Sequence, residues 1–276
     1  MLAIDHSAVD YSFLRRIVHA HSNNVLDASR DSIFDARLAG LVRARGMSSL
    51  RELIESLRRA RNSELELAVA DAMTINETSF FRDGRPFELL RSDLLPKLIE
   101  ARRPVRALRL WSAACATGQE PYSLAMLVRE NFPHLTNWDM QIEGTDVCRP
   151  VLERARSGRY ARMEVNRGLP ARMLIRYFKQ EGDDWVIKPE LRAICRFQYA
   201  NLCKPPLPVR ERFDVIFLRN VMLYFAGDAR RSVLAQIHRL LAPDGVLFLG
   251  SSEQPVDMSL WSANLVGGTC YFRPKC

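Results

Sequence analysis

The sequence predicts an α/β protein in which a doubly wound sheet follows a small all-helical N-terminal region. Three observations support this prediction. Residues 1–75 show only the periodicity of amphipathic helices. From residue 106 onward, short strand-like segments are followed by segments with apolar residues at helical spacing, which is typical of strand–helix repeats in a parallel sheet. Residues 265–272 surround Gly267 and Gly268, which fits a C-terminal antiparallel hairpin.

The N-terminal region contains four predicted helices. Apolar stripes run through residues 11–18 and 33–42, and Gly46 ends the second stripe. Two capping-box patterns, Ser49-x-x-Glu52 and Ser63-x-x-Glu66, would open the third and fourth helices, because the Ser oxygen and the Glu carboxylate satisfy unpaired amides at a helix start. Residues 1–75 therefore read as one small helical domain.

The remaining chain reads as alternating strands and helices. We expect strands at Arg106–Trp111, Asp139–Thr145, Ile194–Ala200, Phe213–Leu218 and Val246–Gly250, and helices at Pro86–Arg102, Gln119–Glu130, Arg149–Ser157 and Asp228–Leu241. A turn at Ala242–Gly245 separates the last helix from the last parallel strand.

Residues 158–192 interrupt this alternation. Tyr160, Leu174, Tyr177 and Phe178 suggest a helix, which a turn at 181–184 and a short strand at 185–187 follow. We therefore expect a small inserted subdomain between the second and third strands of the sheet.

A tight turn of small residues follows the first strand. Ala114, Ala116 and Gly118 alternate with other residues just before a helix, which lets a nucleotide-like ligand approach the backbone at a helix N-terminus. An ordinary strand-to-helix loop would look the same. Asp146 ends the second strand, where two carboxylate oxygens match two vicinal sugar hydroxyls, although it would also serve as the N-cap of the following helix.

The segment Asn76–Asp83 combines polar residues with an adjacent Phe pair. One interpretation is a capped loop that leads into the next helix. The other is a lid, in which Phe80 and Phe81 anchor the segment to the core while Asn76, Thr78 and Arg82 face a ligand.

Three segments closely resemble the chemotaxis-receptor glutamate methyltransferases, the CheR family. They are Asn76–Asp83, Trp111–Ser123 and Phe213–Phe225, in the family's order, and with the helical N-terminus the resemblance covers nearly the whole chain. It implies a Rossmann-like class I methyltransferase sheet at 106–276, a cofactor lid and linker helix at 76–105, and a receptor-docking domain at 1–75.

The resemblance also implies the reaction. S-adenosylmethionine would donate a methyl group to glutamate carboxylates of methyl-accepting chemoreceptor helical bundles, which yields glutamyl methyl esters and S-adenosylhomocysteine and serves sensory adaptation. A carboxylate is already ionised at neutral pH, so catalysis needs alignment and exclusion of water rather than a general base.

The roles of individual residues follow from the family's motifs. Asn76 and Thr78 would hold the methionyl portion of the cofactor, and Arg82 would lie near the sulfonium and orient the incoming glutamate. Glu120 would lie near the ammonium and Asp146 would bind the ribose hydroxyls. Asn201 and Leu202 would border the adenine, and Arg219 and Asn220 would line the pocket after the fourth strand. Tyr224 would hold the substrate carboxylate, and plain packing beside Phe225 is the alternative.

The charge distribution suggests a partner. The chain carries a net charge of +8, and residues 30–61 contain eight Arg against four acidic residues. This surface is either a solvated face or a docking surface for an acidic helical partner, with Arg37, Arg43 and Arg45 as the candidate residues. Some relatives grip a receptor pentapeptide with a Gly-rich loop in the inserted subdomain. Here that loop is short and holds only Gly182, so we expect no such tether.

Two other enzyme classes share this sheet. A nucleic-acid methyltransferase would fit the basic charge, but Arg219-Asn220-Val221-Met222 stands where base methylators carry an Asp/Asn-Pro-Pro-Tyr-like motif. A nicotinamide-dependent dehydrogenase would need a stricter glycine motif. A non-catalytic S-adenosylmethionine sensor is a third alternative.

The remaining expectations concern setting and assembly. The six Cys form no Cys-x-x-Cys pair, and His19 and His21 would face different sides of a helix, so no metal site is expected. We see neither a signal peptide nor an apolar run long enough to span a membrane. We expect a cytoplasmic monomer that binds no nucleic acid.

Overall fold

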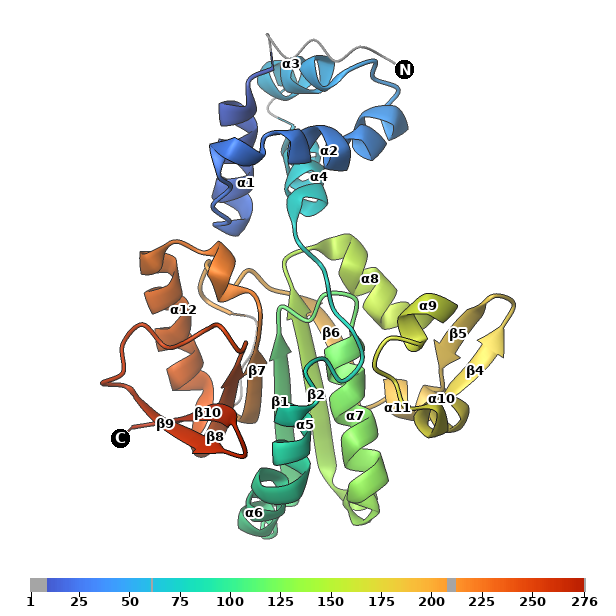
Figure 1. Cartoon of the computed structure of the whole chain (residues 1–276), viewed down its shortest axis with the longest axis vertical. Helices are drawn as coiled ribbons and strands as arrows, with labels where there is room; N and C mark the ends of the chain where they lie inside the picture. The colour runs from blue at the N-terminus through green and yellow to red at the C-terminus, as the bar shows by residue number, and fades with distance from the viewer. Residues whose placement is uncertain (1–8, 61, 208–211, 276) are drawn as a thin grey trace. The chain divides into compact units, whose positions relative to one another are not determined.

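The computed structural model describes residues 9–60, 62–207 and 212–275 of the chain (Figure 1). These residues form two compact units. The helical unit comprises residues up to Ile75 together with Tyr224–Ala229, and the sheet unit comprises Asn76–Leu223 and the residues from Arg230 onward.

The described part of the helical unit contains four α-helices. They are α1 (Tyr11–Ser22), α2 (Ser32–Ala44), α3 (Leu50–Ala60) and α4 (Ser63–Met73). Each helix turns an apolar stripe inward, and Leu14, Phe34, Leu38, Leu53 and Val69 are almost completely buried.

One predicted helix cap is wrong by a residue. The N-cap of α4 is Asn62 rather than Ser63, because the Asn62 Oδ1 atom accepts hydrogen bonds from the backbone N–H groups of Glu64 and Leu65 at 3.1 and 3.2 Å. At α3, Ser49 Oγ accepts from the Glu52 N–H at 3.3 Å, but the Glu52 carboxylate bonds to Ser48 instead of reaching back to Ser49.

A short segment distant in sequence completes the helical unit. The Val25 N–H donates a hydrogen bond to the Tyr224 carbonyl oxygen at 2.9 Å, and Asn24 forms an isolated antiparallel bridge with Phe225. The Phe225 side chain is buried. Tyr224 therefore lies in the helical unit, immediately after the chain leaves the sheet unit.

Within the described residues, the main sheet has seven strands in the order β6-β2-β1-β7-β8-β10-β9. They are β1 (Ala107–Ala113), β2 (Asp139–Asp146), β6 (Cys195–Tyr199), β7 (Phe213–Leu218), β8 (Leu241–Leu249), β9 (Trp261–Val266) and β10 (Thr269–Pro274). The first five in spatial order are parallel, and β10 runs antiparallel to β8 and β9. The predicted doubly wound sheet with a C-terminal hairpin is thus confirmed.

Helices α7 (Gln119–Asn131), α8 (Arg149–Ser157) and α12 (Gly227–Leu240) connect the strands. Leu124 of α7 packs with Leu110 of β1 and Phe217 of β7 in one apolar core. Since the five parallel strands all end at the same edge, the loops that follow them meet there, where ligands of such sheets bind.

The helix expected at Pro86–Arg102 is interrupted. It consists of α5 (Arg85–Leu89), a π-helical turn η3 (Leu90–Leu94) and α6 (Leu95–Arg102). Pro96, at the start of α6, has no N–H to donate to the preceding turn, and its ring crowds the carbonyl four residues earlier. The wider turn accommodates both effects.

The turn predicted at Ala242–Gly245 lies within β8 instead of preceding it. Phe213 is opposite Leu241, whereas Val215 is opposite Val246, so the residues between them form an irregularity in the ladder. Arg102 fixes this bulge, because its Nη1 atom donates to Asp244 at 2.8 Å and its Nε atom donates to Asp214 at 2.7 Å.

The inserted subdomain is a three-stranded antiparallel sheet, which Figure 1 shows beyond α7. Its strands are β3 (Arg159–Ala161), β4 (Phe178–Glu181) and β5 (Asp184–Ile187), and its helices are α9 (Arg162–Val165), α10 (Ala171–Tyr177) and α11 (Pro189–Arg192). The expected turn and short strand are present. The helix prediction was wrong for Tyr160, which lies in β3, and for Phe178, which begins β4.

Candidate active site

The segment Asn76–Asp83 is anchored at Phe80. This ring is fully buried and meets the rings of Tyr160 and Phe178 edge-on, with centroids 5.1 and 5.6 Å away. The chain also passes very close to Gly168, where an added Cβ would lie 2.1 Å from the Phe80 carbonyl oxygen. The Phe81 N–H donates to Ser123 Oγ at 2.9 Å, which ties the segment to α7.

The loop between β1 and α7 has an unusual backbone. Ala114, Ala116 and Gly118 have φ angles of 61°, 48° and 92°, in the left-handed region that disfavours residues with a Cβ. Gly118 adopts such an angle without strain, whereas Ala114 and Ala116 carry a steric cost, and the loop is buried except at half-buried Ala114. No residue with a side chain fits at position 118 without a shift of its neighbours, because a Cβ on Gly118 would lie 2.8 Å from the Cβ of Ala155.

Asp146 holds that loop in place. Its buried carboxylate accepts hydrogen bonds from the N–H groups of Ala116 and Cys148, both at 2.9 Å. Burial raises the pKa of the Asp146 carboxyl, and these backbone hydrogen bonds oppose the rise. The N-cap of α8 is Cys148, so Asp146 is not the helix cap considered from the sequence. The Val147 N–H is a third donor to this carboxylate, which has about four acceptor sites, so acceptor capacity remains for a ligand.

An ion cluster centred on a buried arginine joins the segment Asn76–Asp83 to the end of β7. Arg219 is 2% exposed at its side chain and donates from Nη1 to Glu120 Oε2 at 3.0 Å. Its Nη2 atom donates to the Arg82 carbonyl oxygen at 3.1 Å and forms an ion pair with Asp83. Glu120 also accepts from Ser112 Oγ at 2.8 Å. One guanidinium thus faces two carboxylates, which leaves a formal charge of −1.

Glu253 is a residue whose position the sequence reasoning missed. This buried carboxylate accepts hydrogen bonds from four backbone N–H groups. They belong to Gly250 at 2.8 Å, Asn220 at 2.7 Å, Met222 at 2.8 Å and Leu223 at 3.3 Å. It therefore holds the loop after β7, in which Asn220 has a left-handed φ of 59°. The only signal in the sequence is an acidic residue in the turn after the last parallel strand.

The other predicted site residues that belong to the sheet unit lie at the carboxyl edge of the main sheet. Asn76 Nδ2 is 3.7 Å from Cys148 Sγ, and Thr78 is half-buried. Arg82 Nη1 donates to the Glu77 carbonyl oxygen at 2.8 Å, within its own segment. Asn201 and Leu202 are buried in the loop after β6, where Asn201 Oδ1 accepts from the Cys203 N–H at 3.0 Å. Tyr224 belongs to the helical unit.

The three candidate docking residues differ in their contacts. The Arg37 guanidinium donates to the carbonyl oxygens of Met73 and Thr74, each at 3.0 Å, and so closes the C-terminal end of α4. The Arg37 guanidinium is thus engaged within the helical unit, a role that its charge alone did not predict. Arg45 forms an exposed ion pair with Glu64 at 3.1 Å, and Arg43 is exposed.

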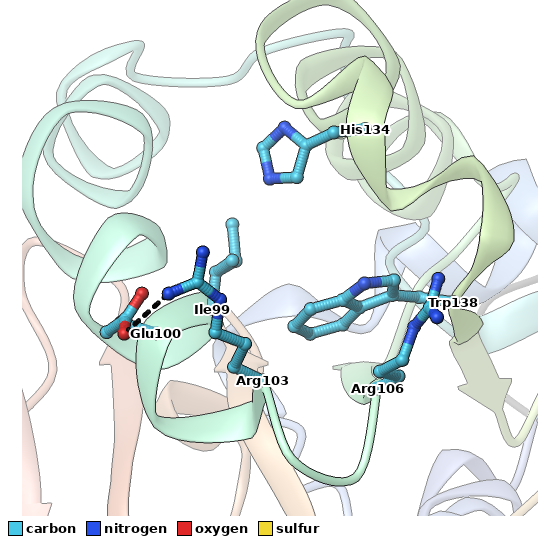
Figure 2. A pocket seen from close by; sticks show the side chains of 6 residues that line it. All are labelled: Ile99, Glu100, Arg103, Arg106, His134 and Trp138. Carbon is cyan, nitrogen blue, oxygen red and sulfur yellow. Dashed lines mark hydrogen bonds and ion pairs between the residues drawn. The ribbon is translucent and has the colours of Figure 1, made fainter.

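Two cavities lie at opposite edges of the main sheet. One, of about 400 Å³, borders the ion cluster and is lined by Asp83, Arg219 and residues after β8. The other, of about 330 Å³, lies beside the amino ends of β1 and β2. Figure 2 shows the Trp138 ring and Arg106 on one side of it and His134 on another. The second cavity is remote from the polar cluster, so the candidate active site is at the carboxyl edge.

The described residues contain neither a cluster of metal-binding side chains nor a membrane-spanning helix. No group of three or more His, Cys, Asp or Glu side chains within them could hold a metal ion. No described helix is long and apolar enough to cross a membrane.

Comparisons with known proteins point to one family. The family described as CheR methyltransferase, SAM binding domain, matches residues 76–268. Chemotaxis protein methyltransferase 1 of Pseudomonas aeruginosa is 39% identical over 249 residues, 88% of this chain and 89% of that protein. Chemotaxis protein methyltransferase 1 of Vibrio cholerae is 36% identical over 257 residues, 92% of each chain. The chemotaxis protein methyltransferase of Borreliella burgdorferi is 32% identical over 248 residues, 88% of this chain and 87% of that protein.

Proposed function

This chain belongs to the CheR methyltransferase family and depends on S-adenosylmethionine, and we propose that it methylates glutamate side chains of chemoreceptor signalling domains. The product is a glutamyl methyl ester, which adjusts the receptor during sensory adaptation. The relatives are named as chemotaxis protein methyltransferases, and each aligns with most of this chain. Both facts support the substrate assignment.

The observation that carries the proposal is the ion cluster of Glu120, Arg219 and Asp83. The Arg219 and Glu120 side chains are 2% and 12% exposed, whereas the Asp83 side chain is 48% exposed. The cluster has a formal charge of −1, and S-adenosylmethionine carries a sulfonium and an ammonium beside a single carboxylate. A carboxylate that is as shielded from water as Glu120 stabilises such a cation more strongly than an exposed carboxylate does.

The neighbouring residues fit the rest of the cofactor. Ala114, Ala116 and Gly118 carry no side chain larger than a methyl group, so a ligand can approach this loop closely, above all at half-buried Ala114. The remaining acceptor capacity of the Asp146 carboxylate suits a ribose hydroxyl. Asn201 offers a polar edge and Leu202 an apolar face for the adenine. We assign Asn76 and Thr78 to the methionyl portion, and Asn220 with Arg219 to the pocket wall.

The protein contributes alignment rather than proton transfer. Bound S-adenosylmethionine supplies an electrophilic methyl group, and the glutamate carboxylate is ionised at neutral pH. Arg82 uses only part of its guanidinium on the Glu77 carbonyl, so its other N–H groups are available to orient the incoming carboxylate. We assign Tyr224 a second contact to that carboxylate. The anchored segment Asn76–Asp83 acts as a lid that excludes water.

Transfer of a labelled methyl group tests the proposal. Labelled S-adenosylmethionine is incubated with purified chemoreceptor cytoplasmic fragments, and base-labile volatile methanol is counted. The wild type should release methanol from a receptor, and Arg82→Ala should lose most of that signal while still binding S-adenosylhomocysteine. Label that is stable to base and appears in RNA or DNA would instead support a nucleic-acid methyltransferase.

We further propose how the substrate is recruited. The helical unit docks the receptor bundle through Arg43 and Arg45, which remain exposed. The β4–β5 turn contains only Gly182 and Asp183, which is too short to grip a tail peptide, so methylation proceeds without a tether. Removal of the receptor's C-terminal tail should leave the rate unchanged. We expect the enzyme to act as a cytoplasmic monomer, which sedimentation and cell fractionation would check.

A further inference from the structure

The cavity of about 400 Å³ at the carboxyl edge extends beyond the candidate active site. Asp83 and Arg219 of the ion cluster form one end of it. From there it continues over the residues that follow β8 and reaches Gly268 and Thr269 at the start of β10. The cavity thus connects the proposed methyl-transfer site to a surface, between the residues after β8 and the start of β10, to which no function has been assigned.

The charged residues that line this cavity have polar partners, with one exception. Asp83 and Arg219 pair with each other, and the Glu253 carboxylate accepts hydrogen bonds from four backbone N–H groups. Arg85 is the exception. Within the described part of the chain its side chain has no ion pair or hydrogen bond, and a Cβ on Gly268 would lie 3.4 Å from its Nη1 atom. Arg85 therefore places an unpaired guanidinium at the far end of the cavity.

The two ends of the cavity are separated by two strand spacings. Arg219 directly follows β7, Gly268 directly precedes β10, and β8 lies between these strands. Neighbouring strands lie about 4.8 Å apart, so the two residues are about 10 Å apart across the sheet edge. A carboxylate at the Arg219 end cannot also contact a guanidinium beside Gly268.

The walls between these ends favour a charged contact at Arg85. Pro86, Leu249 and Phe272 line the cavity and are buried. Apolar walls limit the access of water, so a carboxylate near Arg85 would interact more strongly than on an open surface. Gly268 has no side chain that could close this end.

We propose that Arg85 binds a second acidic side chain of the substrate helix, within two helical turns of the glutamate that is methylated. This inference rests on the proposed function. A helix rises about 5.4 Å per turn, so two turns span the roughly 10 Å between the ends of the cavity. Arg85 is then a specificity residue: it selects glutamates that have an acidic neighbour at this distance, and it makes no contact with the cofactor.

The first experiment compares Arg85→Ala with Arg91→Ala. Arg91 is a matched control, because it is also exposed on the same stretch of helix but is paired with Glu88 and does not line the cavity. With a receptor fragment that the wild type methylates, Arg85→Ala should raise KM for the fragment about tenfold, the effect of losing one charge-assisted contact. Its kcat, and its affinity for S-adenosylhomocysteine in calorimetry, should stay unchanged, as should every parameter of Arg91→Ala.

The second experiment exchanges the charges. Each acidic residue within two turns of the labelled glutamate is changed to Lys in turn, and one such fragment should be a poor substrate for the wild type. Arg85→Glu should restore its methylation. An unchanged KM in Arg85→Ala, or failure of Arg85→Glu to rescue any fragment, would overturn the assignment of Arg85 while the proposed function stands. If the wild type labels no receptor fragment, both inferences are wrong.

Discussion

Glu253→Gln should damage both the stability and the activity of the sheet unit. The Glu253 carboxylate accepts from four N–H groups, two on each oxygen. The Gln amide keeps one acceptor oxygen and places an NH₂ group against the other two donors. Two hydrogen bonds to a charged acceptor are therefore lost, at about 1.5 kcal/mol or more each, so we expect a loss of about 3 kcal/mol.

Activity should fall for a geometric reason. The four N–H groups hold the loop that carries Asn220 directly after Arg219. A displacement of about 1 Å at a reacting centre commonly lowers the rate by about a hundredfold. We therefore expect kcat of Glu253→Gln to fall about ten- to a hundredfold, while the receptor KM changes less.

Methyl-transfer kinetics and thermal unfolding would be measured together. A loss of about 3 kcal/mol corresponds to a decrease in Tm of about 6–12 °C for a unit of this size. Glu100→Gln is the control, because Glu100 forms only an exposed pair with Arg103 at the opposite edge of the sheet. A Glu253→Gln protein with the Tm and kcat of the wild type would refute the reasoning.

Two further predictions concern stability and docking. Burial raises the pKa of Glu143 to about 7, above its value of about 4.3 in an unfolded chain, so this carboxyl destabilises the fold progressively as the pH rises from 4 to 7. Denaturant titrations of Glu143→Gln should show a stability gain of up to about 3 kcal/mol at pH 8 and little gain at pH 4, and an equal gain at both would contradict this. Arg37→Ala should destabilise the helical unit by about 1–3 kcal/mol through the lost bonds to Met73 and Thr74, whereas Arg43→Ala should leave Tm unchanged and raise the receptor KM. The reverse pattern in melting and kinetic assays would assign docking to Arg37.

Local patterns predicted four parallel strands, β1, β2, β6 and β7, to within two residues at each end. Phe213–Leu218, for example, has the same bounds in the structure as in the prediction. The inserted subdomain was harder, since its strands are only three or four residues long. Tyr160 was placed in a helix for that reason, whereas its position is set by long-range contacts to Phe80 and the Thr117 carbonyl.

Roles that depend on tertiary contacts were not visible in the sequence. Arg37 is one of many Arg residues in a basic stretch, and only the fold brings it to the end of α4. Glu253 follows Asn220 by 33 residues, and no local pattern connects them. The resemblance predicted which residues surround the cofactor, but not that Arg219 binds Asp83 and thereby joins the segment Asn76–Asp83 to β7.

The discontinuity of the helical unit has a consequence for dissecting this protein. Tyr224–Ala229 lies between two parts of the sheet unit in the sequence, yet it completes the helical unit through Val25 and Asn24. A fragment that ends at residue 75 would lack this piece, and cutting the chain between the two units therefore requires three breaks rather than one.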